Sequence, residues 1–299
     1  MMFLIADSGS TKTDWVLVDS KHQEVVAEYH SQGINPVHQS EDTIREILAS
    51  IPLRNATLHC VPHSYLQVGE PSGGRTPSPI TQVFFYGAGC TEAHIPTVRR
   101  LLNETFQVTD VEVNSDLLGA ARSLCRKEAG IACILGTGAN SCLYDGERIV
   151  RNTPALGYIL GDEGSGAVLG RLFVNALYKG QLPATLRKSF EHDTGLDLVT
   201  IINKVYREPM ANRFLASLST FIGKHLDCEP LRQLVVQNFR KFFRHNLVAY
   251  ETSHLPVGAV GSIAWYYREQ LAEAAAAEGF RLGTVMQSPM KGLIAFHNS

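Results

Sequence analysis

Asp7-Ser8-Gly9-Ser10-Thr11-Lys12-Thr13 separates two apolar runs, Phe3–Ala6 before it and Trp15–Val18 after it. Small polar residues between two short apolar runs predict a tight β-hairpin that joins two buried strands. Asp19 follows the second run and closes the unit. This hairpin is the main evidence for the fold, because the chain contains a second copy of it.

The repeat begins at the apolar run Ile131–Leu135. Gly136-Thr137-Gly138-Ala139-Asn140 forms the turn, and Ser141–Tyr144 returns to Asp145. Two copies of one strand–hairpin–strand unit indicate an internal duplication. We therefore expect an α/β fold with two similar domains that face each other across a cleft.

The remaining segments fit two such domains. A chain of 299 residues is long for one core and suits two. We expect domains at 1–113 and 114–285, with a tail at 286–299 that can pack back on the first domain. Pro62–Pro79 reads as a long loop. The other expected strands are Glu24–Tyr29, Val83–Tyr86, Val108–Val113 and one within Val257–Ala264; the expected helices are Asp42–Leu48, Leu117–Cys125, Ala167–Tyr178, Ala264–Glu278 and most of Leu182–Tyr250.

The composition argues against several classes of protein. Hydrophobic residues make up 44% of the chain, and 27 basic residues face 29 acidic ones, for a net charge of -2. Nucleic-acid and membrane-surface partners require a concentrated positive field, so we expect neither. The six cysteines form no C-x-x-C pair, which favours reduced thiols. The apolar start is too short for a signal peptide or a membrane span, so we expect a cytoplasmic protein.

Both hairpins are candidate phosphate-binding turns. Backbone N–H groups in a turn of small residues can converge on an anion, although an ordinary hairpin explains the same pattern. Asp7, at the end of a buried strand, could organise a hydrated Mg²⁺, which favours one or two carboxylates and water. The candidate nucleotide-binding residues are Asp7, Gly9, Ser10, Thr11, Lys12, Thr13, Gly136, Thr137 and Gly138.

Two acidic motifs stand at expected helix starts. Asn114-Ser115-Asp116 is explained by N-capping, for which these residue types are favoured, or by a general base, with Asp116 accepting the proton of an attacking hydroxyl. Gly161-Asp162-Glu163-Gly164-Ser165-Gly166 is explained by an acidic helix start. Alternatively, Asp162 or Glu163 accepts hydrogen bonds from sugar hydroxyls.

Taken together, these motifs resemble a known family. The two hairpins resemble the phosphate-1 and phosphate-2 hairpins of the actin/hexokinase superfamily, and Asn114–Asp116 resembles its catalytic-aspartate junction. Gly161–Gly166 is similar to the Gly-Asp-Glu-Gly-Ser signature of N-acetylglucosamine kinases, a group related to the activating ATPases of benzoyl-CoA reductase and 2-hydroxyglutaryl-CoA dehydratase. The likeness runs from Asp7 to Gly170 and resumes at Val257–Ser262 and Gln287–Leu293. Ser8 and Ser10 depart from it, because glycines are common there.

The resemblance implies two ribonuclease-H-like domains and roles for individual residues. Asp116 would be the catalytic base, and Gly261 would lie near the adenosine of ATP. Thr11, Lys12 and Thr137 would hold phosphate. The residues that would bind the sugar are Asn35, Asp116, Ala139, Asn140, Gly157 and Asp162.

The expected activity is phosphorylation of N-acetylglucosamine to its 6-phosphate, with ATP and Mg²⁺. Three alternatives remain open. The sugar could be glucosamine, N-acetylmuramic acid or glucose. The chain could be an ATPase that activates an electron-transfer enzyme, a role that needs cysteines for an iron–sulfur cluster. It could also be a sugar-sensing regulator. A homodimer is a further option.

Overall fold

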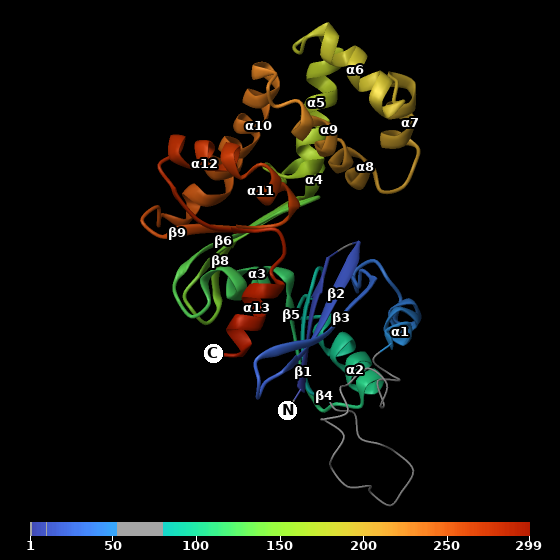
Figure 1. Ribbon diagram of the computed structural model, residues 1–299, viewed down its shortest axis with the longest axis vertical. Helices are drawn as coiled ribbons and strands as arrows, with labels where there is room; N and C mark the ends of the chain where they lie inside the picture. The colour runs from blue at the N-terminus through green and yellow to red at the C-terminus, as the bar shows by residue number, and fades with distance from the viewer. Residues whose placement is uncertain (1, 10, 53–79) are drawn as a thin grey trace, which may run out of the picture. The chain divides into compact units, whose positions relative to one another are not determined.

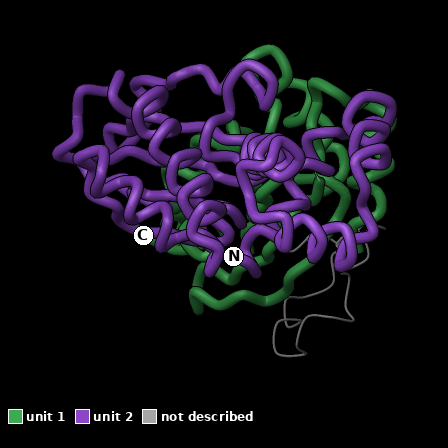
Figure 2. Tube along the Cα trace, turned by 90° about the horizontal axis from the view of Figure 1, so that it is seen from above, with its two compact units in different colours: residues 1–123, 290–299 green, residues 124–289 purple. Residues whose placement is uncertain are grey.

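The structure is a computed structural model that describes residues 2–9, 11–52 and 80–299. Ser10, Cys60 and the expected loop Pro62–Pro79 lie outside the described residues. The chain divides into two compact units, residues 1–123 with 290–299 and residues 124–289 (Figure 2). Each unit has its own sheet and its own core.

The sheet of the first unit is mixed. Its strands are β1 (Met2–Ser8), β2 (Lys12–Asp19), β3 (Glu24–Gln32), β4 (Ile80–Gly87) and β5 (Asp110–Ser115), in the spatial order β3-β2-β1-β4-β5. The first three form an antiparallel meander, whereas β4 and β5 run parallel to β1. Alternate side chains therefore point to opposite faces, with Leu4 and Ala6 in one core cluster and Phe3 and Ile5 in another.

Helices cover both faces of this sheet. α1 (Glu41–Ala49) and α2 (Ile95–Phe106) bury their apolar stripes in the larger core cluster. α13 (Met290–His297) places Met290 and Leu293 against the opposite face (Figure 1). Helix α3 (Asp116–Cys125) follows β5 directly, so the fold carries Asp116 at the point where that strand ends.

The sheet of the second unit repeats the pattern of the first. Its strands are β6 (Gly130–Leu135), β7 (Ala139–Tyr144), β8 (Ile149–Thr153), β9 (Pro256–Val260) and β10 (Arg281–Met286), in the order β10-β9-β6-β7-β8. An antiparallel meander again comes first, and two parallel strands extend it beyond its first strand. The duplicated α/β fold expected from the two hairpins is confirmed.

The second unit also holds the expected helical region. Phe173 of the central helix α5 (Gly166–Tyr178) packs edge-on against Phe190, with ring centroids 5.2 Å apart, and both rings are fully buried. This aromatic contact ties α5 to the helices that follow it. The helices are α4 (Gly157–Leu160), α5 (Gly166–Tyr178), α6 (Ala184–Thr194), α7 (Leu198–Tyr206), α8 (Ala211–Ser217), α9 (Ser219–Lys224), α10 (Glu229–Phe242), a π-helix (Phe243–Leu247) and a 3₁₀-helix (Val248–Tyr250).

The boundary between the units differs from the expected one at residue 113. It falls after Ser123, so most of α3 belongs to the first unit. Gly119 lies directly on the Tyr86 side chain, where an added Cβ would come within 2.9 Å. Arg122 donates hydrogen bonds to the Tyr86 hydroxyl, at 2.8 Å, and to Glu112, at 2.6 Å. These contacts hold α3 to β4 and β5.

The C-terminal residues group with the first unit, from residue 290. The His297 ring stacks on Phe84 with centroids 3.6 Å apart, and its Nε2 lies 2.8 Å from the Tyr86 hydroxyl oxygen. Burial lowers the pKa of His297 to about 4, and the nearby Arg122 charge contributes. The ring is therefore neutral at physiological pH.

One expected helix is two. Ala264–Glu278 divides into α11 (Ser262–Tyr266) and α12 (Arg268–Ala277). Tyr267 leaves helical geometry at φ -111° and ψ 27°, and its buried hydroxyl donates to the Ser219 carbonyl oxygen at 2.5 Å. Tertiary burial thus overrides the helical propensity of the alanine-rich segment. Within the described residues, no helix is long and apolar enough to cross a membrane.

Candidate functional site

The first hairpin is closed by its own backbone and by two hydroxyls. The Gly9 N–H donates to the Lys12 carbonyl oxygen at 3.0 Å. Ser8 and Thr13, opposite each other in the register, bring their hydroxyl oxygens to 2.7 Å. The Ser8 hydroxyl also accepts from the Ile34 N–H at 2.9 Å. The serine that replaces a family glycine therefore anchors the segment that carries Asn35.

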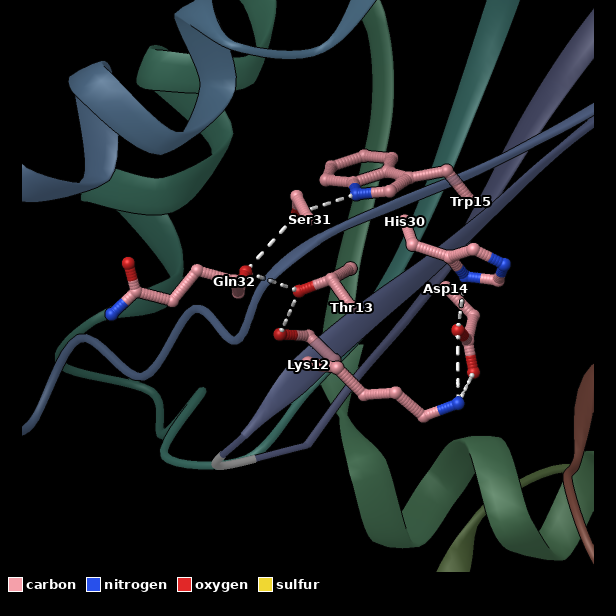
Figure 3. Close-up of polar contacts among 8 residues, drawn as sticks. Lys12, Thr13, Asp14, Trp15, His30, Ser31 and Gln32 are labelled. Carbon is pink, nitrogen blue, oxygen red and sulfur yellow. Dashed lines mark hydrogen bonds and ion pairs between the residues drawn. The ribbon is translucent and has the colours of Figure 1, made fainter.

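Lys12 lies in an ion pair on the surface of the sheet. Its Nζ is 2.9 Å from an Asp14 carboxylate oxygen, and His30 Nδ1 is 2.7 Å from the other (Figure 3). The Lys12 side chain is 67% exposed, so its ammonium remains free to exchange this partner for a phosphate. Asp14 was missed by the sequence reasoning, although its place two residues after Lys12 sets both side chains on one face of β2.

Asp7 and Asp116 lie at the ends of two strands, β1 and β5, that flank β4. Asp7, Tyr86 and Asn114 are partners in the register of β1, β4 and β5, which puts the first and third about 10 Å apart across the sheet. Asp116 follows Asn114 by two residues. The topology therefore gathers the two carboxyls at one edge of the sheet.

The electrostatics of the two carboxyls reflect this placement. Burial raises the pKa of Asp7 to about 7, and the negative charges of Asp116 and Asp14 add to the rise. Burial also raises the pKa of Asp116, while hydrogen bonds from backbone N–H groups, including that of Leu117, oppose the rise. Two carboxyls that repel each other in a poorly hydrated place form a site that favours a cation or a proton.

The residues present fit a hydrated Mg²⁺. Asp7 and Asp116 offer carboxylate oxygens, the ligands that this ion prefers, and their mutual repulsion is relieved by a positive charge. The described residues contain no cluster of three or more His, Cys, Asp or Glu side chains able to hold a metal. Two carboxyls suit an ion held by one or two carboxylates, phosphate and water.

Asn35 is fixed by its neighbours in the first unit. Its Oδ1 accepts from the Val37 N–H at 3.1 Å, and its backbone N–H donates to Gln39 Oε1 at 2.8 Å. Gly89 lies against the Asn35 side chain, because a Cβ at Gly89 would come within 2.1 Å of Oδ1. Because Oδ1 already accepts a hydrogen bond, the Asn35 amide can present its N–H groups to a ligand.

The second hairpin is bound to the start of α5. The Gly166 N–H donates to the Gly136 carbonyl oxygen at 2.9 Å, and the Ala167 N–H donates to that of Thr137 at 3.1 Å. Ser165 Oγ accepts from the Val168 N–H and caps the helix. The hairpin thereby satisfies N–H groups of the helix start, and the turn is held rigidly in place.

The carboxyl of Asp162 lies directly on this hairpin. A Cβ added to Gly138 would come within 3.1 Å of Asp162 Oδ2. Burial raises the pKa of Asp162 to about 6, and hydrogen bonds from the backbone of Ala139 and Gly157 oppose the rise. The structure therefore brings together Ala139, Gly157 and Asp162, three of the residues expected to bind the sugar.

Glu163 points elsewhere. Its Oε1 lies 2.8 Å from Nδ1 of His245, a residue of the π-helix after α10. Asp162 and Glu163 are consecutive in the motif, but their side chains contact different parts of the second unit. Of the two carboxylates considered from the sequence, Asp162 is the one that lies on the hairpin.

Gly261 lies at the base of the same hairpin. An added Cβ would approach the Leu135 carbonyl oxygen to 2.3 Å, and the residue has φ +124°. Only glycine combines this backbone conformation with such a close approach. The site residues of the second unit thus surround one turn.

The chain matches no protein-family model, and no curated protein matches its sequence. Among solved structures, it is similar to a provisionally named N-acetylglucosamine kinase from Porphyromonas gingivalis. The identity is 44%, the match covers 99% of this chain and 98% of that one, and the TM-score is 0.89.

Two more distant structures share the fold. One is a provisionally named N-acetylglucosamine kinase from Chromobacterium violaceum, at 18% identity over 99% of this chain and 98% of that one, with a TM-score of 0.71. The other is a glucokinase of the ROK family from Streptomyces griseus, solved with glucose and AMPPNP, at 13% identity over 99% and 98% of the chains, with a TM-score of 0.52. The chain therefore belongs to the same family as the Porphyromonas protein and is an ATP-dependent sugar kinase.

Proposed function

We propose that the protein transfers the γ-phosphoryl group of ATP to the 6-hydroxyl of N-acetylglucosamine, with Mg²⁺ as the metal. The observation that carries this proposal is the 44% identity, over nearly the whole chain, to the provisionally named kinase for that sugar. The amide and carboxylate groups of Asn35, Asn140 and Asp162 support it, since they suit hydroxyls and an acetamido group. We also propose that the chain is related to the activating ATPases of benzoyl-CoA reductase and 2-hydroxyglutaryl-CoA dehydratase.

In the proposed reaction Asp116 is the general base. The sugar oxygen attacks the γ-phosphorus, its proton passes to an Asp116 carboxylate oxygen, and the bond between that phosphorus and the bridging oxygen of ADP breaks. Burial raises the pKa of Asp116, which makes its carboxylate a better proton acceptor than an exposed one. Bound Mg²⁺ would neutralise the charge on the phosphates.

The chain's own groups complete the proposed site. Asp7 would hold the metal through water, and the hairpins at Gly9–Thr13 and Gly136–Gly138 would hold phosphate oxygens, with Gly261 near the adenosine. Asp162 would accept hydrogen bonds from sugar hydroxyls, while backbone bonds from Ala139 and Gly157 hold it in place. We also propose the cytoplasm as the location, where reduced cysteines would persist.

A panel of sugars incubated with ATP and Mg²⁺ tests the proposal, with ADP release measured against a control without sugar. We expect kcat/KM for N-acetylglucosamine to exceed that for glucose by at least about 10²-fold, because a site built for a polar group penalises its absence. Equal values would contradict the acetamido preference. A clear preference for glucosamine or N-acetylmuramic acid would replace the substrate, and ADP release that ignores sugar would favour an activating ATPase.

The sugar KM should also depend on pH through Asp162. Because its pKa is raised to about 6, this carboxyl is ionised at pH 7.5 and becomes protonated as the pH falls through 6. Protonation removes a charge-assisted acceptor, so the KM for sugar should rise on the acid side. Steady-state kinetics between pH 5 and 8 measure this. Asp162→Asn should remove the dependence, and a wild-type KM that stays flat across this range would exclude the role.

A further inference from the structure

The side chain of Asn140 is held in one orientation by two hydrogen-bond donors. Its Oδ1 accepts from the Ser141 N–H at 2.9 Å and from Asn152 Nδ2 at 2.9 Å. A backbone N–H can only donate, so the atom that faces it must be the amide oxygen. The orientation of Asn140 therefore follows from the backbone of β7.

The second donor, Asn152, is fixed by the same logic. Its Nδ2 donates to the Ser141 carbonyl oxygen at 2.6 Å and to that of Thr153 at 3.2 Å. Carbonyl oxygens only accept, so Asn152 must turn its nitrogen toward them. The register of β7 and β8 sets this position, because Ser141 pairs with Thr153 and Cys142 pairs with Asn152.

The consequence is that Asn140 can meet a ligand only as a donor. Its Nδ2 forms no hydrogen bond with the residues that the structure describes, and Ala139 beside it binds the Asp162 carboxylate through its backbone. Asn140, whose N–H groups are free of these bonds, thus directly follows the residue that binds the carboxyl we assign to the sugar. An amide held by two donors cannot turn its oxygen to a ligand without losing both bonds.

The kind of ligand follows from this fixed polarity. A hydroxyl both donates and accepts, so it would be satisfied by either end of an amide, whereas a carbonyl oxygen only accepts. We infer that Asn152 is a positioning residue that holds Asn140 as a donor to the acyl carbonyl oxygen of an N-acylated amino sugar. This inference rests on the proposed function and adds a residue that positions a sugar-binding side chain.

The test replaces Asn152 by aspartate, which has the same shape but cannot donate. The Asn140 oxygen then loses one hydrogen-bond donor. Because the carboxylate at position 152 only accepts hydrogen bonds, it should attract the Asn140 nitrogen and turn it away from the sugar. We expect Asn152→Asp to lower kcat/KM for N-acetylglucosamine by about 10-fold or more through the sugar KM. The value for glucose should change less than about 3-fold, and the KM for ATP should stay constant.

Three further variants complete the experiment. Asn203→Asp makes the same charge change on the exposed face of α7 and should leave both sugars unaffected. Asn152→Ala removes the donor without adding charge and should give a smaller loss of the same preference, which serves if the aspartate variant folds poorly. In an Asn140→Ala background, Asn152→Asp should cause no further loss of sugar preference, because Asn152 affects that preference only through Asn140.

The outcomes separate the inference from the proposed function. If wild type prefers the N-acylated sugar but Asn152→Asp lowers both sugars equally, or neither, the positioning role is wrong and the proposed function stands. An additive loss in the Asn140→Ala background would overturn it in the same way. If the wild-type protein does not prefer any N-acylated sugar, the inference and the proposed function are both wrong.

Discussion

Asp116→Asn should lower kcat by about 10²–10⁴-fold while leaving the fold and the sugar affinity nearly unchanged. Asparagine keeps the shape of the side chain and can still hydrogen-bond a sugar hydroxyl, but it cannot take the proton. The loss should therefore appear in kcat, with little change in the Kd for sugar. Initial rates beside sugar binding by calorimetry give both quantities.

Helix capping is the competing explanation of Asp116, and the structure makes the two roles separable. The Ser115 hydroxyl accepts from the Leu118 N–H at 3.2 Å, whereas the Asp116 carboxylate accepts from the Leu117 N–H at 2.9 Å and from its own backbone N–H. Since asparagine caps about as well as aspartate, Asp116→Asn should cost no more than about 1 kcal/mol of stability. Asp110→Asn, at the opposite and exposed end of β5, is the matched control. A stable Asp116→Asn protein with near-normal kcat would remove Asp116 from catalysis.

The sequence predicted the parts of the fold that local patterns control. The runs Phe3–Ala6 and Ile131–Leu135 lie in central strands that are almost entirely buried, and an uninterrupted apolar run is typical of such strands. Small residues between each run and the next marked both hairpins. Because the two units repeat one topology, recognising the repeat was enough to predict the architecture.

Features that depend on distant contacts could not be predicted in this way. Helix α2 was not expected, although its apolar residues recur at helical spacing. The break at Tyr267, by contrast, depends on a buried hydroxyl that bonds to Ser219, 48 residues away. The end of the first unit depends on Arg122, which joins α3 to Tyr86 on β4. None of these contacts leaves a periodic signal in the sequence.

The residues of the candidate site also divide into those that local motifs predict and those that depend on distant contacts. Asp7, Asp116 and Asp162 stand at strand or helix ends that short motifs mark. Asn152 has no motif, and its link to Asn140 appears only when the register of β7 and β8 is known. Sequence motifs thus identify residues that would touch ligands, while the residues that orient them require the paired strands.

The metal role of Asp7 leads to an equally large expected effect. Chelation with EDTA should abolish turnover, and Asp7→Asn should lower kcat by at least about 10²-fold even with Mg²⁺ in excess, because the neutral amide no longer attracts the cation that balances the phosphate charge. Turnover measured against Mg²⁺ concentration should show that raising the metal does not restore the variant. Full activity of Asp7→Asn would remove Asp7 from the mechanism.

The thermal stability of the Asp7→Asn protein without ligands is the control for misfolding. The pKa of Asp7 determines whether the Tm of the variant should lie above or below that of wild type. Burial and the neighbouring carboxylates raise this pKa from 3.8 to about 7. Between these values the folded protein binds more protons than the unfolded chain, so the contribution of Asp7 to stability falls as the pH rises through this window and stays unfavourable above it. Asp7→Asn removes the buried charge. The variant should therefore have a higher Tm than wild type at pH 8 without Mg²⁺, and the difference should shrink toward pH 5. Inactive protein with this raised Tm would assign the lost turnover to the metal site, whereas a lowered Tm at pH 8 would contradict the repulsion between Asp7 and its neighbours.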